Sequence, residues 1–238
     1  MNKGKGKREM MQILLLIGIL LIAITAFVYC EKKPKKIVYK KCVKEKLKTT
    51  KQIKKQENIL FLGDSITEYY PIDSIYKDLP IVKSGVAGYR TKDILDRMQT
   101  MVYQYNPTKI FLLIGTNDIV DAGEEEKEKT INNIKEIIEK IKENRKKATI
   151  YLESIYPVNK GINKKVVENR DNNTIQEINK ELKDYCKKNN IKYIDMYKEL
   201  KDEDDNFSKD YTDDGLHPNS LGYARISQVR IKEIYDIK

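Results

Sequence analysis

Short apolar runs recur along the chain from residue 58 onward, and each ends in polar or glycine-rich residues. The runs are apolar at consecutive positions, not only at alternate ones, which is typical of strands buried on both faces of a parallel sheet. They predict five strands, at residues 58–62, 79–84, 109–114, 149–154 and 191–195.

Helical periodicity fills three intervals of the same region, residues 124–147, 167–188 and 219–237. In each of the first two, apolar residues recur at spacings of three and four and therefore share one face. Cys186 lies in the second interval and is expected to be a small core residue. Strands that alternate with helices predict an α/β fold, a parallel doubly wound sheet in a three-layer α/β/α sandwich. In such sheets the functional site lies at the carboxyl ends of the strands.

Residues 11–29 form an apolar run without charge, preceded by basic residues. As a helix this run would span roughly 28 Å, close to the ~30 Å thickness of the hydrocarbon core. We therefore expect residues 1–30 to be a signal-anchor or transmembrane segment that holds the protein in the membrane. One alternative is a cleaved secretory signal. Another is lipidation of Cys30, which the bulky Tyr29 before it disfavours.

The charge of the chain is concentrated near its N-terminus. The net charge is +10, but the first 56 residues hold 16 Lys and Arg against 3 Glu, so the remainder is slightly acidic. We expect residues 31–56 to be a solvated Lys-rich tether, and the alternative is contact with anionic lipid or an anionic cell wall. No basic groove is expected on residues 57–238, which argues against a nucleic-acid partner. Three widely spaced cysteines give no disulfide framework and no zinc site.

Four polar motifs fall where the predicted strands end or before the last helix. They are Gly63-Asp64-Ser65-Ile66, Gly85-Val86-Ala87-Gly88, Gly115-Thr116-Asn117-Asp118 and Asp214-Gly215-Leu216-His217-Pro218. Ser65 lies where a strand turns into a helix, and the helix N-terminus offers unpaired N–H groups and a positive dipole. These features suit a nucleophile whose attack creates an oxyanion. Taken alone, Ser65 could equally be a helix cap or a turn residue.

His217 is the single histidine of the chain. A serine hydroxyl needs a base that titrates near neutral pH, and imidazole is the usual one. Asp214, three residues earlier, can hold the imidazole tautomer, and Asp213 competes for that role. A backbone N–H at Gly88 and the side-chain amide of Asn117 can both donate to an oxyanion, although each could also be only a turn residue. Gly85 and Gly115 are assigned mainly to turns.

Ser, Gly, Asn and His in this order, one in each motif, resemble the SGNH hydrolases, also called the GDSL esterase/lipase family, over residues 57–238. The resemblance implies a flavodoxin-like fold with five parallel strands. It makes Ser65 the nucleophile and Asp214 and His217 the rest of a triad. Ser65, Gly88 and Asn117 would form the oxyanion hole. One departure is Lys83, where many members have Asn, which leaves the hydrogen bonding of that loop open.

The predicted activity is hydrolysis of short-chain acyl esters through an acyl-enzyme, with no metal and no organic cofactor. The absence of an obvious lid insertion favours an open site for acetyl esters on carbohydrate or cell-wall polymers. Alternatives are acyl transfer to sugar hydroxyls, lysophospholipase or thioesterase activity, and a non-catalytic cell-surface binding module. An N-terminal anchor before a hydrolase domain favours an extracellular location. Basic residues on both flanks leave a cytoplasmic orientation open.

Overall fold

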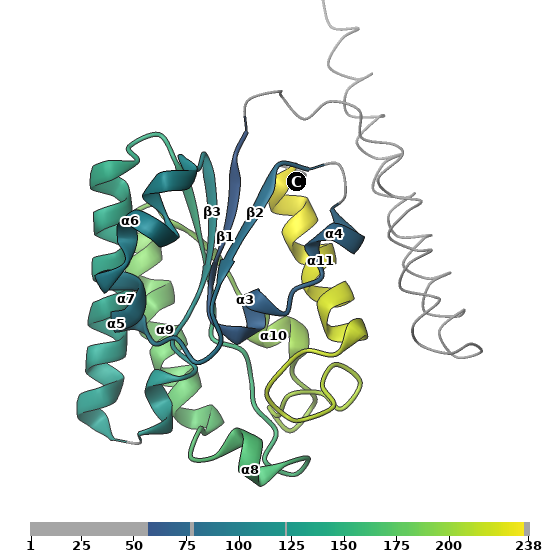
Figure 1. Ribbon diagram of the computed structural model, residues 1–238. Coiled ribbons are helices and arrows are strands. Elements are labelled where there is room, and N and C mark those ends of the chain that lie inside the picture. Colours follow the sequence, from purple (N-terminus) through teal and green to yellow (C-terminus); the bar gives the residue numbers. More distant parts are fainter. Residues whose placement is uncertain (1–56, 77–78, 122, 236–238) are drawn as a thin grey trace, which may run out of the picture. The chain divides into compact units, whose positions relative to one another are not determined.

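The computed structural model describes residues 57–76, 79–121 and 123–235 (Figure 1). The expected anchor and tether, residues 1–56, lie outside the described residues. Five strands form one parallel sheet in the order β2-β1-β3-β4-β5, which confirms the predicted flavodoxin-like sheet. The strands are β1 (Ile59–Gly63), β2 (Ile81–Gly85), β3 (Lys109–Leu113), β4 (Thr149–Glu153) and β5 (Lys192–Ile194).

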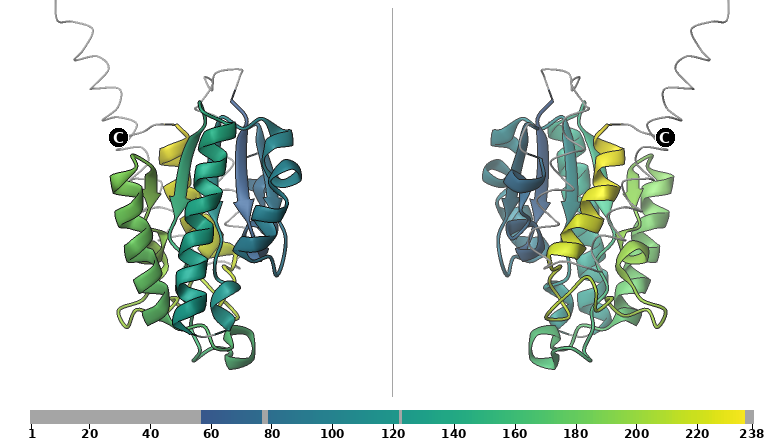
Figure 2. Two further views of the ribbon diagram at one scale, coloured as in Figure 1. Left: turned by 90° about the vertical axis from the view of Figure 1, so that its left-hand side faces the viewer. Right: turned by 90° about the vertical axis from the view of Figure 1, so that its right-hand side faces the viewer.

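Helices cover both faces of this sheet, so the predicted three-layer sandwich is confirmed (Figures 1 and 2). One face carries α5 (Thr91–Asp96), α6 (Met98–Met101), α7 (Glu124–Asn144) and α9 (Asn172–Lys188). The other carries α4 (Ile72–Ile75) and α11 (Ser220–Ile234). The remaining short elements are α3 (Ser65–Glu68), α8 (Lys164–Val167), α10 (Met196–Leu200) and the 3₁₀ turns η1 (Tyr103–Tyr105) and η2 (Asp118–Val120). Within the described residues, no helix combines the length and apolarity needed to cross a bilayer.

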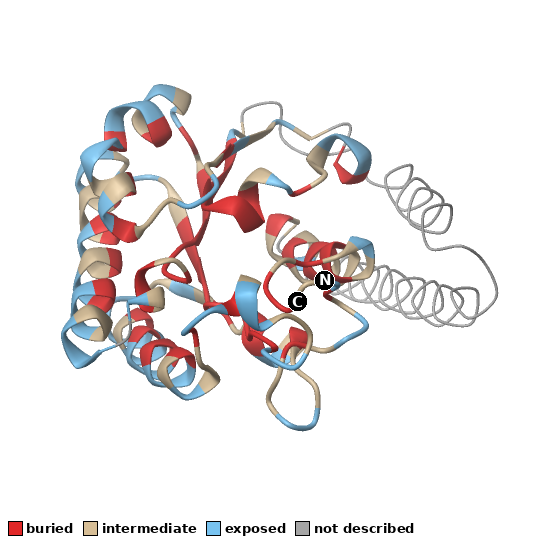
Figure 3. Cartoon of the chain, turned by 60° about the horizontal axis from the view of Figure 1, so that its bottom comes forward, coloured by how far each residue is buried: buried red, intermediate tan, exposed pale blue. Residues whose placement is uncertain are grey.

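Alternate side chains of the central strands supply two cores. Leu60 and Leu62 of β1 are fully buried in the apolar cluster that also contains Ile134 and Ile138 of α7. Phe61, between them, points to the opposite face, where the guanidinium of Arg230 from α11 lies 4.5 Å from its ring centroid. Each fully buried side chain of this kind contributes about 1.5–3 kcal/mol relative to exposure. Figure 3 shows the buried positions along the strands and on the inner sides of the helices.

The expectation that all five strands are buried on both faces is wrong for the two at the edges. In β2 only Ser84 is buried and Lys83 is exposed, and in β5 only Ile194 is buried. These strands have one sheet neighbour each, so their outer sides meet solvent. The short apolar runs could not distinguish a central strand from an edge strand.

Helix boundaries differ from the predicted ones, and at the start of α9 a helix cap is the reason. The interval 167–188 is interrupted at Glu168, whose φ of 56° is left-handed, and α9 begins after Asp171. The carboxylate of Asp171 accepts hydrogen bonds from the backbone N–H groups of Asn173 and Thr174, both at 3.0 Å. At the other boundary, α7 ends at Asn144, three residues early. Cys186 is buried on α9, as predicted, and burial raises its pKa to about 11.

A buried ion pair connects β4 to α11 beneath the aromatic core. Arg230 Nε and Nη2 donate to the two carboxylate oxygens of Glu153 at 2.5 and 2.9 Å, and both side chains are almost fully buried. Tyr156 donates to the same carboxylate at 2.7 Å. Because both oxygens of the Glu153 carboxylate accept hydrogen bonds, the free-energy cost of burying its negative charge is reduced. Nothing in the sequence pattern indicated this pair.

Candidate active site

Ser65 lies at the carboxyl end of the inner strand β1, where the chain turns directly into α3. The preceding residue, Asp64, caps that helix, because its Oδ1 accepts the backbone N–H of Ile66 at 2.9 Å. Ser65 is only 7% exposed, yet its hydroxyl faces His217. The strand-to-helix position predicted for this residue is therefore confirmed.

The loop before α11 places His217 opposite Ser65. The Oγ of Ser65 and the Nε2 of His217 are 3.0 Å apart, and the Nδ1 of His217 is 2.7 Å from Asp214 Oδ2. Asp214, rather than Asp213, is thus the carboxylate beside the imidazole. The exposed carboxylate of Asp213 instead accepts a hydrogen bond from Asn219 at 3.1 Å. Three predicted residues from two ends of the domain therefore form one hydrogen-bonded series.

Backbone contacts fix the Asp214–His217 segment. Asp214 Oδ1 accepts the N–H groups of Leu216 at 2.9 Å and of His217 at 2.7 Å. Gly215 has a φ of +83°, and a Cβ there would lie 2.3 Å from the carbonyl oxygen of Asn159, so the tight turn requires glycine. Burial opposes ionisation of Asp214, but the hydrogen bonds from His217 and Leu216 together outweigh burial and hold the pKa of Asp214 below its ordinary value.

Thr212 also stabilises the Asp214–His217 segment, a role that the sequence analysis did not predict. Its hydroxyl donates to the carbonyl oxygen of His217 at 2.8 Å and accepts the N–H of Gly215 at 2.9 Å. The residue lies two positions outside the Asp-x-x-His motif. A Ser or Thr this close to a turn was the only available signal, and it is a weak one.

Gly88 and Asn117, the two other predicted residues, follow β2 and β3. Gly88 has a φ of +79° and open space where a Cβ would be. Asn117 precedes η2, and its Nδ2 donates to the carbonyl oxygen of Tyr89 at 2.9 Å. One amide hydrogen of Asn117 is thereby used and a second remains. Gly115 lies in a turn with a φ of 122°, as predicted, whereas Gly85 is the last residue of β2.

Arg170 contacts Asn117 and was not predicted. It is 5% exposed, and its Nη2 donates to Asn117 Oδ1 at 2.9 Å while its Nε donates to the carbonyl oxygen of Thr116 at 2.8 Å. Burial lowers the pKa of this guanidinium, and the nearby Glu168 partly opposes that effect. The residue lies between α8 and α9, in a stretch where no motif distinguishes it from other charged residues.

Lys83, the departure from the family pattern, has a definite role in the loop after α3. Its Nζ donates to the carbonyl oxygens of Glu68 and Tyr70, the latter at 3.2 Å. The side chain of Glu68 in turn accepts the N–H of Ala87 at 2.6 Å, next to Gly88. In this chain the hydrogen bonds of that loop are therefore made by a Lys and a Glu.

An aromatic side chain borders the candidate site on its solvent side. Tyr69, the residue directly after α3, is 54% exposed, and its ring centroid is 5.5 Å from that of His217 at an interplanar angle of 57°. Its backbone N–H donates to the carbonyl oxygen of Ser65 at 2.9 Å, so the ring is tied to the same helix as the serine. Tyr69 is thus a large hydrophobic side chain that is exposed, in a described region where the others are buried or partly buried.

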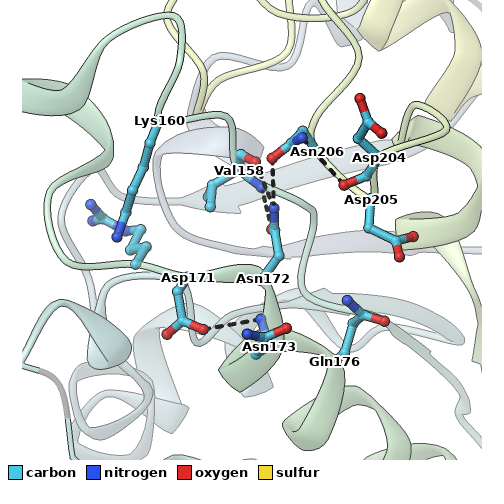
Figure 4. Close-up of a pocket in the computed structure, with 10 residues that line it drawn as sticks. Val158, Lys160, Asp171, Asn172, Asn173, Gln176, Asp204, Asp205 and Asn206 are labelled. Carbon is cyan, nitrogen blue, oxygen red and sulfur yellow. Dashed lines mark hydrogen bonds between the residues drawn. The ribbon is translucent and has the colours of Figure 1, made fainter.

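A separate polar cavity of about 340 Å³ lies at the start of α9 (Figure 4). Ser65, Asp214 and His217 do not line it, but Arg170 does, so this residue borders both the cavity and Asn117. The other side chains around it are those of Val158, Lys160, Asp171, Asn172, Asn173, Gln176, Asp204, Asp205 and Asn206. No cluster of His, Cys, Asp and Glu suited to hold a metal ion occurs within the described part of the chain.

The arrangement at Ser65 provides a hydroxyl, a base in contact with it, and a carboxylate that orients the base. Amide donors lie on neighbouring strand ends. These are the groups that acyl transfer needs: a nucleophile, a proton acceptor and donors for a developing oxyanion.

Comparisons with known proteins identify a family and several similar proteins. The model of the GDSL-like Lipase/Acylhydrolase family matches residues 61–225. A solved Streptococcus pneumonia protein, provisionally named a platelet activating factor, is 30% identical with a TM-score of 0.70, over 92% of this chain and 99% of that chain. An acetylxylan esterase from Geobacillus stearothermophilus shares the fold, with 18% identity and a TM-score of 0.57 over 75% of this chain and 94% of that chain.

A longer relative also matches. An N-acylneuraminate cytidylyltransferase of Escherichia coli is 32% identical over 169 residues, which are 70% of this chain and 38% of that protein. The chain therefore spans less than half the length of this relative, whose name describes the whole of that protein. The family model, in contrast, covers well over half of this chain and includes Ser65, Gly88, Asn117, Asp214 and His217. The chain belongs to the GDSL-like lipase/acylhydrolase family and is a carboxylic ester hydrolase.

Proposed function

We propose that this protein cleaves short-chain acyl esters of carbohydrates through an acyl-enzyme formed on Ser65. The Oγ of Ser65 attacks the ester carbonyl carbon while Nε2 of His217 takes its proton. The bond to the alcohol oxygen then breaks, and His217 returns the proton to that oxygen. Water attacks the acyl-enzyme in the same way, which releases the carboxylic acid and restores the Ser65 hydroxyl.

The observation that carries this proposal is the series Ser65 Oγ, His217 and Asp214, with contacts of 3.0 and 2.7 Å. Asp214 accepts from Nδ1, so Nε2 is left as the acceptor for the serine proton. The lowered pKa of Asp214 keeps its carboxyl group ionised, and the carboxylate stabilises the imidazolium that forms on His217.

The oxyanion would be stabilised by three donors, the N–H groups of Ser65 and Gly88 and the Nδ2 of Asn117. Ser65 is the first residue of α3, so its N–H has no partner within that helix. Gly88 has open space at the position of a Cβ, so no side chain separates its backbone from a ligand on that side, and Asn117 retains one amide hydrogen. Loss of one such donor typically costs about 3–4 kcal/mol of transition-state stabilisation.

Two features support a small acyl group on a sugar. The exposed ring of Tyr69 beside His217 offers an apolar surface against which the carbon face of a sugar ring can pack. The name of one protein that shares the fold, an acetylxylan esterase, is in line with this substrate class. Acyl transfer to a sugar hydroxyl would use the same acyl-enzyme and is the alternative, which the partition of the acyl group between water and an added oligosaccharide distinguishes.

The test is an ester panel on the full chain, with p-nitrophenyl esters from acetyl to palmitoyl and acetylated oligosaccharides as substrates. We expect the highest kcat/KM for acetyl esters, and at least about a 10³-fold loss of kcat in Ser65→Ala. Labelling of the wild type, but not of that variant, by a fluorophosphonate probe would agree. Undiminished turnover by Ser65→Ala would overturn the mechanism, and a preference for palmitoyl esters would overturn the substrate class.

The cellular setting is proposed from the sequence alone. We propose that residues 1–30 anchor the protein in a membrane, that residues 31–56 act as the tether, and that residues 57–238 face the outside. Membrane fractionation followed by protease treatment of intact cells tests both points. Release of the protein into the medium would contradict the proposed anchor. Protection of the domain from protease in intact cells would contradict the proposed orientation.

A further inference from the structure

We propose that Arg170 is a positioning residue that fixes the orientation of the Asn117 amide in the oxyanion hole and strengthens it as a donor. This inference rests on the proposed function, because it concerns the same oxyanion. It assigns a role to a side chain that belongs to none of the four motifs.

The first step is the contact itself. Nη2 of Arg170 donates to Asn117 Oδ1 at 2.9 Å, and Nε donates to the carbonyl oxygen of Thr116 at 2.8 Å. One planar guanidinium therefore holds both the side chain of Asn117 and the backbone just before it. Nη1 of the same group donates to the carbonyl oxygens of Val166 and Val167 at 3.3 and 3.2 Å, which fixes the guanidinium to the α8 segment.

The second step is the orientation of the amide. A guanidinium has only donors, so it can face Oδ1 of Asn117 but not Nδ2. The amide nitrogen must then point away from Arg170, where one hydrogen is taken by the carbonyl oxygen of Tyr89 at 2.9 Å. The other hydrogen is left for a ligand. Without Arg170, rotation of the amide by a half-turn would place the carbonyl oxygen where a donor is required.

The third step is electrostatic. A cation on the oxygen of an amide polarises the group and makes its N–H a stronger donor, an effect that is larger in a poorly solvated site. Arg170 is 5% exposed, and the carboxylate with which it pairs, Glu168, is half exposed and 3.3 Å away. The positive charge is thus only partly compensated, and it reaches the developing oxyanion through the Asn117 amide that it polarises.

The test is a double-mutant cycle on the full chain with p-nitrophenyl acetate, in which kcat, KM and the melting temperature are measured. The variants are Asn117→Ala, Arg170→Met and the combination of the two. Arg145→Met is the matched control, because Arg145 lies between α7 and β4, at the opposite edge of the sheet, where its Nη1 donates to the carbonyl oxygen of Asn144 at 3.1 Å. We expect Asn117→Ala to lower kcat about 10²–10³-fold. Arg170→Met should lower kcat about 10–100-fold with little change in KM, since the interaction acts in the transition state.

The decisive measurement is kcat of the double variant, which combines Asn117→Ala with Arg170→Met. If Arg170 acts through Asn117, the double variant should be no more than about threefold slower than Asn117→Ala alone. A merely structural Arg170 would instead multiply the two losses, and that result overturns the inference. Full activity of Asn117→Ala or of Arg170→Met overturns it as well. Failure of the proposed function is recognised separately, by turnover in Ser65→Ala.

A second variant, Arg170→Lys, tests the inference if Arg170→Met folds poorly. Arg170→Lys keeps the buried positive charge, but one ammonium cannot reproduce the planar fork that reaches Asn117 and Thr116 together. We expect a folded protein with kcat at least about tenfold lower and KM near the wild-type value. Wild-type kcat in Arg170→Lys would overturn the orienting role.

Discussion

One carboxylate, that of Asp214, holds His217 by both its ring and its backbone. Oδ2 lies 2.7 Å from Nδ1 of the imidazole, while Oδ1 accepts the backbone N–H of the same residue at 2.7 Å. The ring therefore has little freedom to rotate, and its Nε2 is directed at the Ser65 hydroxyl. Both the tautomer and the position of the proposed base depend on this single side chain.

Replacement of Asp214 by Asn should lower kcat by about 10³–10⁴-fold, because an amide nitrogen in place of Oδ2 favours the wrong imidazole tautomer. The loss is measured with p-nitrophenyl acetate. Asp213→Asn is the control, since Asp213 is exposed and its carboxylate accepts a hydrogen bond from Asn219 instead. It should stay within about threefold of the wild type. Similar losses in the two variants would contradict the assignment of Asp214.

The buried carboxyl of Asp64 should make the stability of the protein depend on pH. Burial raises the pKa of Asp64 from 3.8 to about 7, and its Oδ2 has no hydrogen-bond partner. Between these two values the unfolded chain binds fewer protons than the native protein, so the free energy of unfolding falls as pH rises. The two values differ by about 3, which corresponds to at most about 4 kcal/mol. This destabilisation is absent below the lower value and complete above the higher one.

Asp64→Asn tests this, because Asn can still accept the helix-capping hydrogen bond that Ile66 donates. Urea unfolding of both proteins at about pH 4 and about pH 7.5 should show the variant gaining stability relative to the wild type as pH rises. The acidic sample is the internal control, since both side chains are uncharged there. A difference that does not change with pH would refute the buried, protonated state of Asp64.

The sequence predicts the residues that carry the proposed chemistry better than the residues that hold them. Ser65 and His217 lie in short motifs at strand ends or before a helix, so topology alone brings them to one edge of the sheet. Arg170 lies 53 residues from Asn117 along the chain, and only the packing of α8 and α9 brings the two side chains together. The same limit applies to the fold. Apolar runs predict the five strands, but whether a strand such as β2 lies at an edge depends on the sheet order.

Removal of one member of the Arg230–Glu153 pair should destabilise the fold strongly. Arg230→Met leaves the Glu153 carboxylate buried without its counter-ion, which costs about 3–5 kcal/mol. Combining Arg230→Met with Glu153→Leu should restore part of that loss, because no buried charge then remains. Denaturant unfolding measures the free energy of unfolding of each variant.

Arg225→Met is the control on the same helix. It removes the half-buried partner of Glu199 and should cost only about 1 kcal/mol. Additive losses in the double variant would exclude the pair as the cause.

The exposed ring of Tyr69 should affect binding of the alcohol group rather than the chemical step. It lies 5.5 Å from the His217 ring and is 54% exposed, so a sugar ring attached to the reacting ester can pack on it. Aromatic packing of this kind contributes about 0.5–1.5 kcal/mol, which is up to about a tenfold change in affinity. We expect Tyr69→Ala to raise KM for an acetylated xylooligosaccharide several-fold and to leave kcat for p-nitrophenyl acetate unchanged. Tyr69→Phe keeps the ring and should behave as the wild type. Equal losses of kcat on both substrates would instead indicate that Tyr69 acts through His217, and the packing surface for a sugar would have to be sought elsewhere.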